Sequence, residues 1–200
     1  MLRLENTPAL SNFLVAAACL LEYAGLFPAF SGELMAIQFI VIHSSAFVMA
    51  IPYLEIPEKW KPRALYSLLC LYALFAIQAG GLSGVFQFAG LTFATYSGYV
   101  LRGDTASRMP LISRWALGFA SFIFVLSVCG VPGDAEDWDG NRRVAFAGAV
   151  YFTLAGLMER AGLHESGWRR ALRWLAARDP EFKARMPGWM AKVLADRGRW

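Results

Sequence analysis

The sequence has few charged residues and few residues that commonly carry chemistry. Only 17% of its 200 residues are charged, and it contains two histidines and three cysteines. A soluble domain usually has about a quarter charged residues, so this composition argues against one. The sequence has no phosphate-binding loop and no dinucleotide-binding motif, and it gives no reason to expect a nucleic-acid partner.

The three cysteines, Cys19, Cys70 and Cys129, each lie within an apolar stretch. Their number is odd and their spacing is not that of metal ligands, so they predict neither a disulfide framework nor a metal site. We expect them to be small buried hydrophobic residues. The sequence identifies no cofactor and no set of catalytic residues.

Hydrophobic residues make up 57% of the chain and gather in six stretches. These cover about 9–30, 33–54, 64–80, 82–101, 111–131 and 143–158. A helix needs about 20 mostly apolar residues to cross a hydrocarbon core of about 30 Å. The pattern predicts an all-α integral membrane protein, with a bundle of about six transmembrane helices in residues 1–160. The third and sixth stretches are short, and their limits are the least defined.

The basic residues fall almost entirely on one side of these stretches. If the N-terminus is cytoplasmic, 17 of the 19 basic residues lie in cytoplasmic segments, and only Arg142 and Arg143 lie outside. Cytoplasmic loops are enriched in lysine and arginine, so we expect both termini to be cytoplasmic. The localisation predicted is a bacterial-type inner membrane, crossed several times.

The last segment, 161–200, has a different composition from the rest. Trp168, Leu172 and Leu175 form an apolar stripe with helical spacing, flanked by arginines. Pro180 interrupts the stripe, because the residue before a proline is disfavoured in a helix. A second stripe follows the interruption, made of Trp189, Met190, Val193 and Leu194. Basic amphipathic helices favour membrane surfaces, so anionic lipid headgroups are the expected partner. A solvated tail and a nucleic-acid patch are the alternatives, and the tryptophans on an apolar stripe suit lipid better than nucleic acid.

Several polar residues fall inside the predicted spans. Glu22 and His43 lie at similar predicted depth on two spans joined by a short turn. Ionisable groups at membrane depth usually have a partner or a function, so we expect these two side chains to meet. Gln38, Gln78 and Gln87 fall in the outer halves of their spans, and together with Glu22 and His43 they predict a polar cavity that opens outward.

A short motif at the start of the fourth stretch, Gly81-Leu82-Ser83-Gly84, resembles the GxSG motif of rhomboid intramembrane proteases. The resemblance implies a six-helix core with Ser83 as nucleophile and a histidine on the second helix, a place loosely comparable to that of His43. The family also needs a histidine on the sixth helix to act as base, and the stretch 143–158 contains none. A serine without a base is a poor nucleophile, so we expect no protease activity.

A second resemblance rests on the run from Ile37 to Phe47 with Glu22 upstream. This is similar to uncharacterised bacterial membrane families in which an early glutamate precedes an apolar helix with one central histidine. Those families imply no activity.

Three classes of function remain open from the sequence. The first is a membrane subunit or scaffold with a Glu–His polar contact, with a homo-oligomer or a membrane partner. The second is a small transporter or proton-linked protein that uses Glu22 and His43. The third is a cofactor-binding protein or a degenerate rhomboid-like protein, in which His43 supplies at most one axial ligand to a haem.

Overall fold

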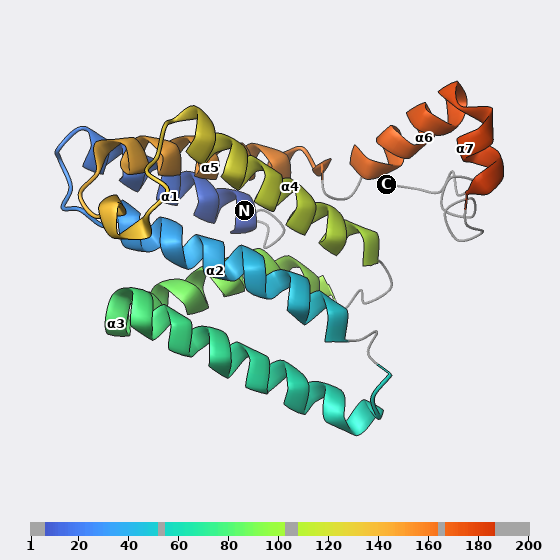
Figure 1. The fold of residues 1–200 in the computed structure, drawn as a ribbon, viewed down its shortest axis with the longest axis horizontal. Coiled ribbons are helices and arrows are strands. Elements are labelled where there is room, and N and C mark those ends of the chain that lie inside the picture. Colours follow the sequence, from blue (N-terminus) through green and yellow to red (C-terminus); the bar gives the residue numbers. More distant parts are fainter. Residues whose placement is uncertain (1–6, 52–54, 103–107, 164–166, 187–200) are drawn as a thin grey trace.

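The computed structural model describes residues 7–51, 55–102, 108–163 and 167–186, and these residues form helices and loops with no strand. The α-helices are α1 (Thr7–Tyr23), α2 (Ser31–Ala50), α3 (Lys61–Arg102), α4 (Arg108–Val128), α5 (Arg142–Arg160), α6 (Trp168–Arg178) and α7 (Pro180–Arg185). Two short 3-10 helices, η3 (Glu58–Trp60) and η4 (Ala135–Trp138), precede α3 and α5. Most of each predicted apolar stretch lies in a helix or in one half of α3 (Figure 1), and the predicted all-α class is confirmed for the described residues.

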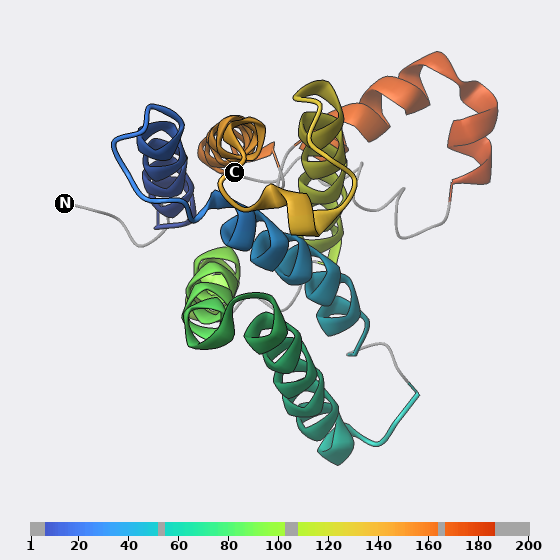
Figure 2. The same ribbon diagram turned by 60° about the vertical axis from the view of Figure 1, so that its left-hand side comes forward.

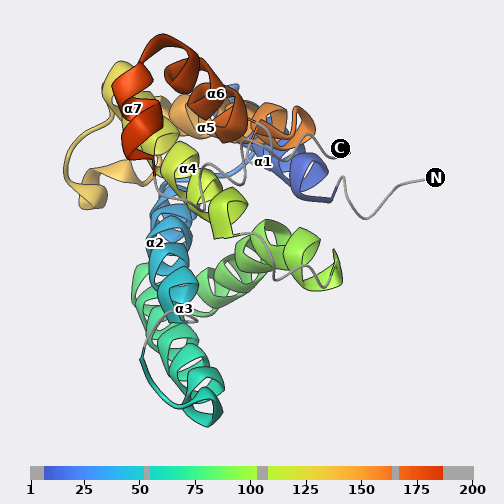
Figure 3. The same ribbon diagram turned by 90° about the vertical axis from the view of Figure 1, so that its right-hand side faces the viewer.

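The third and fourth stretches form one element, α3, which is broken in its middle. Gly80 and Gly81 have non-helical backbone angles, and Gly81 has a φ of +59°. Only glycine adopts this region without strain, so the chain can reverse direction here. The two halves of α3, residues 61–79 and 82–102, diverge from this turn (Figure 3). The break therefore lies where the sequence predicts the link between two spans.

The predicted end of the first span differs from the observed end of α1, and this difference changes the position of Glu22. The first stretch was predicted to run to residue 30, but α1 ends at Tyr23. Gly25 then adopts a φ of +75°, and an irregular segment leads to α2. The prediction was wrong because an apolar composition continues through Leu26 and Phe27, although the backbone has already left the helix.

Successive helices from α1 to α5 run up and down, with the two halves of α3 counted separately (Figure 1). Helix α2 lies in the middle and contacts α3, α4 and α5, while α1 packs along α5 (Figure 2). Three connections gather at one end of the bundle: residues 24–30, 80–81 and 129–141. We call this the loop end.

The core surrounds α2, and close helix contacts depend on small residues. A Cβ on Gly156 of α5 would lie 2.7 Å from the ring of Phe13 on α1, and a Cβ on Gly148 would lie 3.0 Å from the sulfur of Cys19. Cys19 is fully buried, as the sequence predicts, whereas Cys70 is exposed and the prediction for it was wrong.

Large apolar side chains also cover the outside of the bundle. Leu14, Phe86 and Phe124 are 63%, 70% and 63% exposed. Among the described residues, two helical stretches, Ser31–Val48 and Glu58–Phe93, are long and apolar enough to cross a membrane. Two shorter apolar helices, Thr7–Tyr23 and Ile112–Val128, accompany them.

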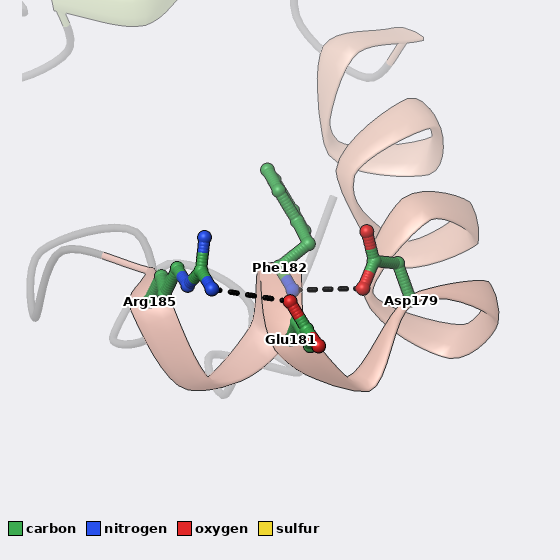
Figure 4. A network of polar contacts seen from close by, with 4 residues as sticks. All are labelled: Asp179, Glu181, Phe182 and Arg185. Carbon is green, nitrogen blue, oxygen red and sulfur yellow. Dashed lines mark hydrogen bonds and ion pairs between the residues drawn. The ribbon is translucent and has the colours of Figure 1, made fainter.

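The C-terminal segment forms α6 and α7, which project beyond the bundle (Figures 1 and 2). The predicted interruption is confirmed: α6 ends at Arg178, and Asp179 begins the next helix by accepting a hydrogen bond from the backbone N–H of Phe182 at 2.9 Å. Glu181 and Arg185 form an exposed ion pair at 3.1 Å (Figure 4). The second predicted stripe, at residues 189–194, lies outside the described residues.

Candidate functional site

Glu22 lies in the last turn of α1 and binds the first residues of α2. Its carboxylate accepts hydrogen bonds from the backbone N–H groups of Phe30 and Ser31, at 3.2 and 2.9 Å, and from the hydroxyl of Ser31 at 2.8 Å. The first N–H groups of a helix have no partner within the helix, and the helix dipole favours a negative charge there. Glu22 is therefore the cap of α2, supplied by the preceding helix.

The predicted contact between Glu22 and His43 is wrong. The Glu22 carboxylate is bound at Ser31, and His43 lies twelve residues further along the same helix, which is about 18 Å of helix length. His43 is exposed and is surrounded by aromatic rings, with ring centroids of Phe39, Phe47 and Tyr72 at 6.0, 5.3 and 6.2 Å. The depth estimate failed because α1 ends at Tyr23, which moves Glu22 from the interior of a span to a helix end.

The three glutamines do not share one cavity. Gln38 is buried and donates from its amide nitrogen to the hydroxyl of Tyr151 on α5 at 3.0 Å. Gln78 is exposed on the first half of α3. Gln87, on the second half, faces α2 and hydrogen-bonds to Glu33 at 2.6 Å. The predicted set of five polar residues is therefore spread over separate contacts.

A cluster that the sequence interpretation missed forms around Glu33, in the first turn of α2. One oxygen of its carboxylate accepts hydrogen bonds from the hydroxyl of Ser83 at 2.5 Å and from the amide of Gln87 at 2.6 Å. The Ser83 hydroxyl also lies 2.8 Å from the carbonyl oxygen of Gly80. We call Glu33, Gly80, Ser83 and Gln87 the helix-break cluster. It joins the start of α2 to the turn inside α3, at the loop end.

The local structure requires glycine at both glycine positions of the Gly81-Leu82-Ser83-Gly84 motif and at Gly80, the residue before it. A Cβ on Gly80 would lie 2.3 Å from the Glu33 carboxylate, so the absence of a side chain lets Glu33 approach. Gly81 needs its positive φ, and a Cβ on Gly84 would lie 2.2 Å from the carbonyl oxygen of Ala76. These residues let the chain fold back closely on itself. The resemblance to the rhomboid motif is explained by this turn.

The hydroxyl of Ser83 contacts the carboxylate of Glu33 and the backbone carbonyl of Gly80. No histidine lies beside it in the described part of the chain. Glu33 and His43 are ten residues apart on α2, about 15 Å along the helix. The described residues therefore provide no Ser–His pair for nucleophilic catalysis. The other histidine, His164, lies outside the described residues.

Two arginines at the start of α5 donate hydrogen bonds to backbone carbonyls at the C-terminal ends of neighbouring helices. Arg142 donates to the carbonyl oxygen of Tyr23, the last residue of α1, at 2.9 Å. Arg143 donates to the carbonyl oxygen of Gly130, just after α4, at 3.3 Å. The last carbonyls of a helix lack intrahelical donors, and a positive charge is favourable there. Arg142 and Arg143 are the two basic residues predicted to lie outside the cytoplasm, and both thus have a structural role at the loop end.

At the opposite end of the bundle, Arg114 of α4 and Glu159 of α5 form an ion pair. Both side chains are 14% exposed, so the pair is largely shielded from solvent. It ties the two helices together where the chain leaves the bundle.

Comparison of the chain with known protein families, with curated proteins and with solved structures finds no match. The helix-break cluster therefore has to be interpreted from its own geometry. It is the one place in the described residues where a carboxylate, a hydroxyl, an amide and a main-chain carbonyl at a helix break converge.

Proposed function

We propose that the chain is a multi-pass membrane protein that acts as a membrane subunit or scaffold. The six helices from α1 to α5, with α3 counted twice, would cross a bacterial-type inner membrane with both termini in the cytoplasm. The observation that carries the proposal is the large number of exposed apolar side chains on the helices. They include Leu14, Leu20, Phe39, Leu74, Phe86, Phe93, Phe124, Phe146 and Leu157.

Exposed apolar side chains of this number are costly in water. Burying a large apolar side chain contributes about 1.5–3 kcal/mol, and soluble monomers seldom expose apolar patches above a few hundred Å². In lipid the same side chains are in a favourable environment. The lengths also support the proposal: α2 and α4 have 20 and 21 residues, which corresponds to about 30 Å of helix.

The distribution of polar groups supports the orientation. The loop end carries the acidic residues of η4 and the two arginines that bind helix carbonyls. The other 17 basic residues belong to the opposite side in the proposed topology. Because Arg142 and Arg143 are held by local hydrogen bonds, their position outside does not weaken the orientation signal from the rest.

The proposed partner of α6 is the anionic lipid of the cytoplasmic leaflet. Arg170, Arg173 and Arg178 lie on this helix, and the guanidinium of Arg178 lies 4.2 Å from the ring of Trp174. Trp174 and Leu175 are exposed and provide apolar contact area. Basic residues near such a surface contribute about 1 kcal/mol each.

The helix-break cluster favours a second candidate, a small ion-linked transporter. Carboxylates in membrane proteins often mark ion pathways, and Glu33 is bonded here to neutral groups, the hydroxyl of Ser83 and the amide of Gln87. In this chain the carboxylate would be Glu33, rather than Glu22 with His43.

Two measurements test these proposals. Membranes that contain the protein are washed with alkaline carbonate, and a membrane-embedded protein is expected to stay in the pellet until detergent is added. Release into the supernatant without detergent would contradict the proposal. Purified protein in sealed proteoliposomes then separates the two candidates: a scaffold carries no flux of Na⁺ or H⁺ above protein-free vesicles, and a transporter does.

A further inference from the structure

We propose that the chain pairs with a second copy of itself through the face of α2 that carries His43, with the two His43 imidazoles hydrogen-bonded across a two-fold axis. This inference rests on the proposed membrane function and specifies the partner that a membrane subunit would have. The depth of His43, its lack of a hydrogen bond, the exposed rings beside it and the chemistry of imidazole support the pairing.

His43 lies close to the middle of α2, far from both ends of the helix. It follows Ser31 by twelve residues and precedes Ala50 by seven, which corresponds to about 18 and 10 Å of helix. Long side chains such as lysine and arginine extend to the surface from positions near a helix end, but the side chain of histidine is too short for these distances. In a bilayer, the exposed imidazole would therefore face hydrocarbon.

Within the described residues, His43 is the polar side chain of α2 that has no hydrogen bond. Its neighbours Ser44 and Ser45 donate to backbone carbonyls of the same helix, at 2.9 and 2.6 Å. Other helices bind the remaining three polar side chains, which are Ser31, Glu33 and Gln38. Hydrocarbon offers no group that replaces a missing hydrogen bond, so an unpaired imidazole there needs a partner from another molecule.

Exposed aromatic rings flank His43 on the same face of α2. Phe39 and Phe47 lie one helical turn before and after it, and they are 40% and 49% exposed. We call Phe39, His43 and Phe47 the histidine face. The ring of Tyr72 on α3 lies 6.2 Å from that of His43. The ring of Phe122 on α4 lies 5.9 Å from that of Phe39. Helices in lipid associate through close packing, and aromatic rings supply a large contact area for it.

The apolar surface continues from the histidine face onto the first half of α3. This half lies beside α2 at the edge of the bundle (Figures 2 and 3). Phe75 on it is exposed, and its ring lies 5.9 Å from that of Tyr72. A second copy can therefore lie along α2 and α3 together.

A second copy supplies the partner that His43 lacks. A neutral imidazole has one N–H donor and one nitrogen acceptor, so it can hydrogen-bond to an identical imidazole. An interface with two-fold symmetry brings the same residue of both copies together. With the axis perpendicular to the membrane, both His43 side chains lie at the same depth. A different partner would need its own polar group at this depth, whereas a second copy provides one by symmetry.

Energy transfer between two fluorescent labels tests the pairing. Full chains that carry a donor or an acceptor label after Trp200 are reconstituted together in phosphatidylcholine vesicles, at decreasing ratios of protein to lipid. We expect transfer to persist under dilution above the level of random mixing, and to fall when unlabelled chain is added in excess. Transfer at the level of random mixing would overturn the proposal, whether lipid or another ligand then covers His43. If such a protein still stays in carbonate-washed membranes, only the pairing fails, whereas release by carbonate would refute the membrane function as well.

Variants assign the pairing to the histidine face. His43→Leu should weaken association about three- to twentyfold, the range that corresponds to one hydrogen bond between membrane helices. His43→Gln keeps a donor and an acceptor, so it should retain most of the association. Phe47→Ala should weaken association through lost packing, and Leu14→Ala is the matched control, because Leu14 is exposed on α1, outside the histidine face. Unchanged association of His43→Leu would refute the assignment. If that variant does not fold, Phe47→Ala decides, and association equal to that of Leu14→Ala would refute it.

Discussion

At the scale of single residues, three charged side chains at the loop end bind backbone groups at the ends of helices. Glu22 gives α2 the hydrogen-bond acceptors that its first N–H groups lack, and Arg142 and Arg143 give donors to the last carbonyls of α1 and α4. These contacts cross from one helix to the next, so each one also fixes the position of a neighbouring helix. The charged residues at the loop end are thus part of the packing.

We expect Glu22→Leu to destabilise the fold by about 1–3 kcal/mol, because two backbone N–H groups and the hydroxyl of Ser31 lose their acceptor. Unfolding by denaturant in detergent measures the change. Glu22→Gln keeps an acceptor oxygen in place and should lose clearly less. Equal stability of the Leu variant and the unchanged chain would show that the cap contributes nothing.

Gly81 offers a second test at this scale. Its φ of +59° is unfavourable for any residue with a Cβ, so Gly81→Ala should cost about 1–3 kcal/mol. Gly90→Ala, in the second half of α3, is the matched control, since nothing lies within 4 Å of its added Cβ. Alanine has the higher helix propensity, so the control should be neutral or stabilising. A similar loss in both variants would contradict the role of the break.

At the scale of elements, the sequence predicts well where helices occur. It predicts poorly which face of each helix packs against its neighbours. A run of about 20 apolar residues is sufficient to identify a helix, and the break at Gly80–Gly81 was placed correctly because two adjacent glycines interrupt it. The end of α1 was placed too late because hydropathy does not register the positive φ of Gly25. That error alone produced the wrong contact between Glu22 and His43.

The helix-break cluster shows why the site was harder to predict than the fold. Glu33 and Ser83 are 50 residues apart, and their contact depends on how the halves of α3 turn around α2. Hydropathy gives the approximate depth of a residue but not the side of the helix on which it lies. One signal was available: Glu33 is an acidic residue in the first turn of a helix, close in depth to Ser83 and Gln87.

A further prediction at the scale of elements concerns the binding of α6 to anionic lipid. The segment 167–200, prepared as a peptide, should gain helicity with vesicles that contain anionic lipid, because its arginines are attracted to the headgroups. Circular dichroism measures the change. Added salt should reverse it by screening, and vesicles of neutral lipid are the control. The same response to neutral and anionic vesicles would exclude an electrostatic contribution.

At the scale of the whole molecule, two features set the arrangement. The helices expose apolar side chains outward and have these charged contacts at the two ends, with Glu22, Glu33, Arg142 and Arg143 at the loop end and the Arg114–Glu159 pair at the other. This division is what a bilayer requires of a bundle, because polar groups are costly in its centre. The central claim is therefore that the loop end lies outside the cytoplasm and the opposite end inside it.

Reporter fusions in a bacterial host test this claim most directly. One reporter is active only in the cytoplasm and the other only outside it, and each is joined after Trp60, after Glu136 and after Trp200. The account predicts cytoplasmic signals at Trp60 and Trp200 and an external signal at Glu136, because 17 of the 19 basic residues would then lie inside. An external signal at Trp200, or the same side for Trp60 and Glu136, would contradict it.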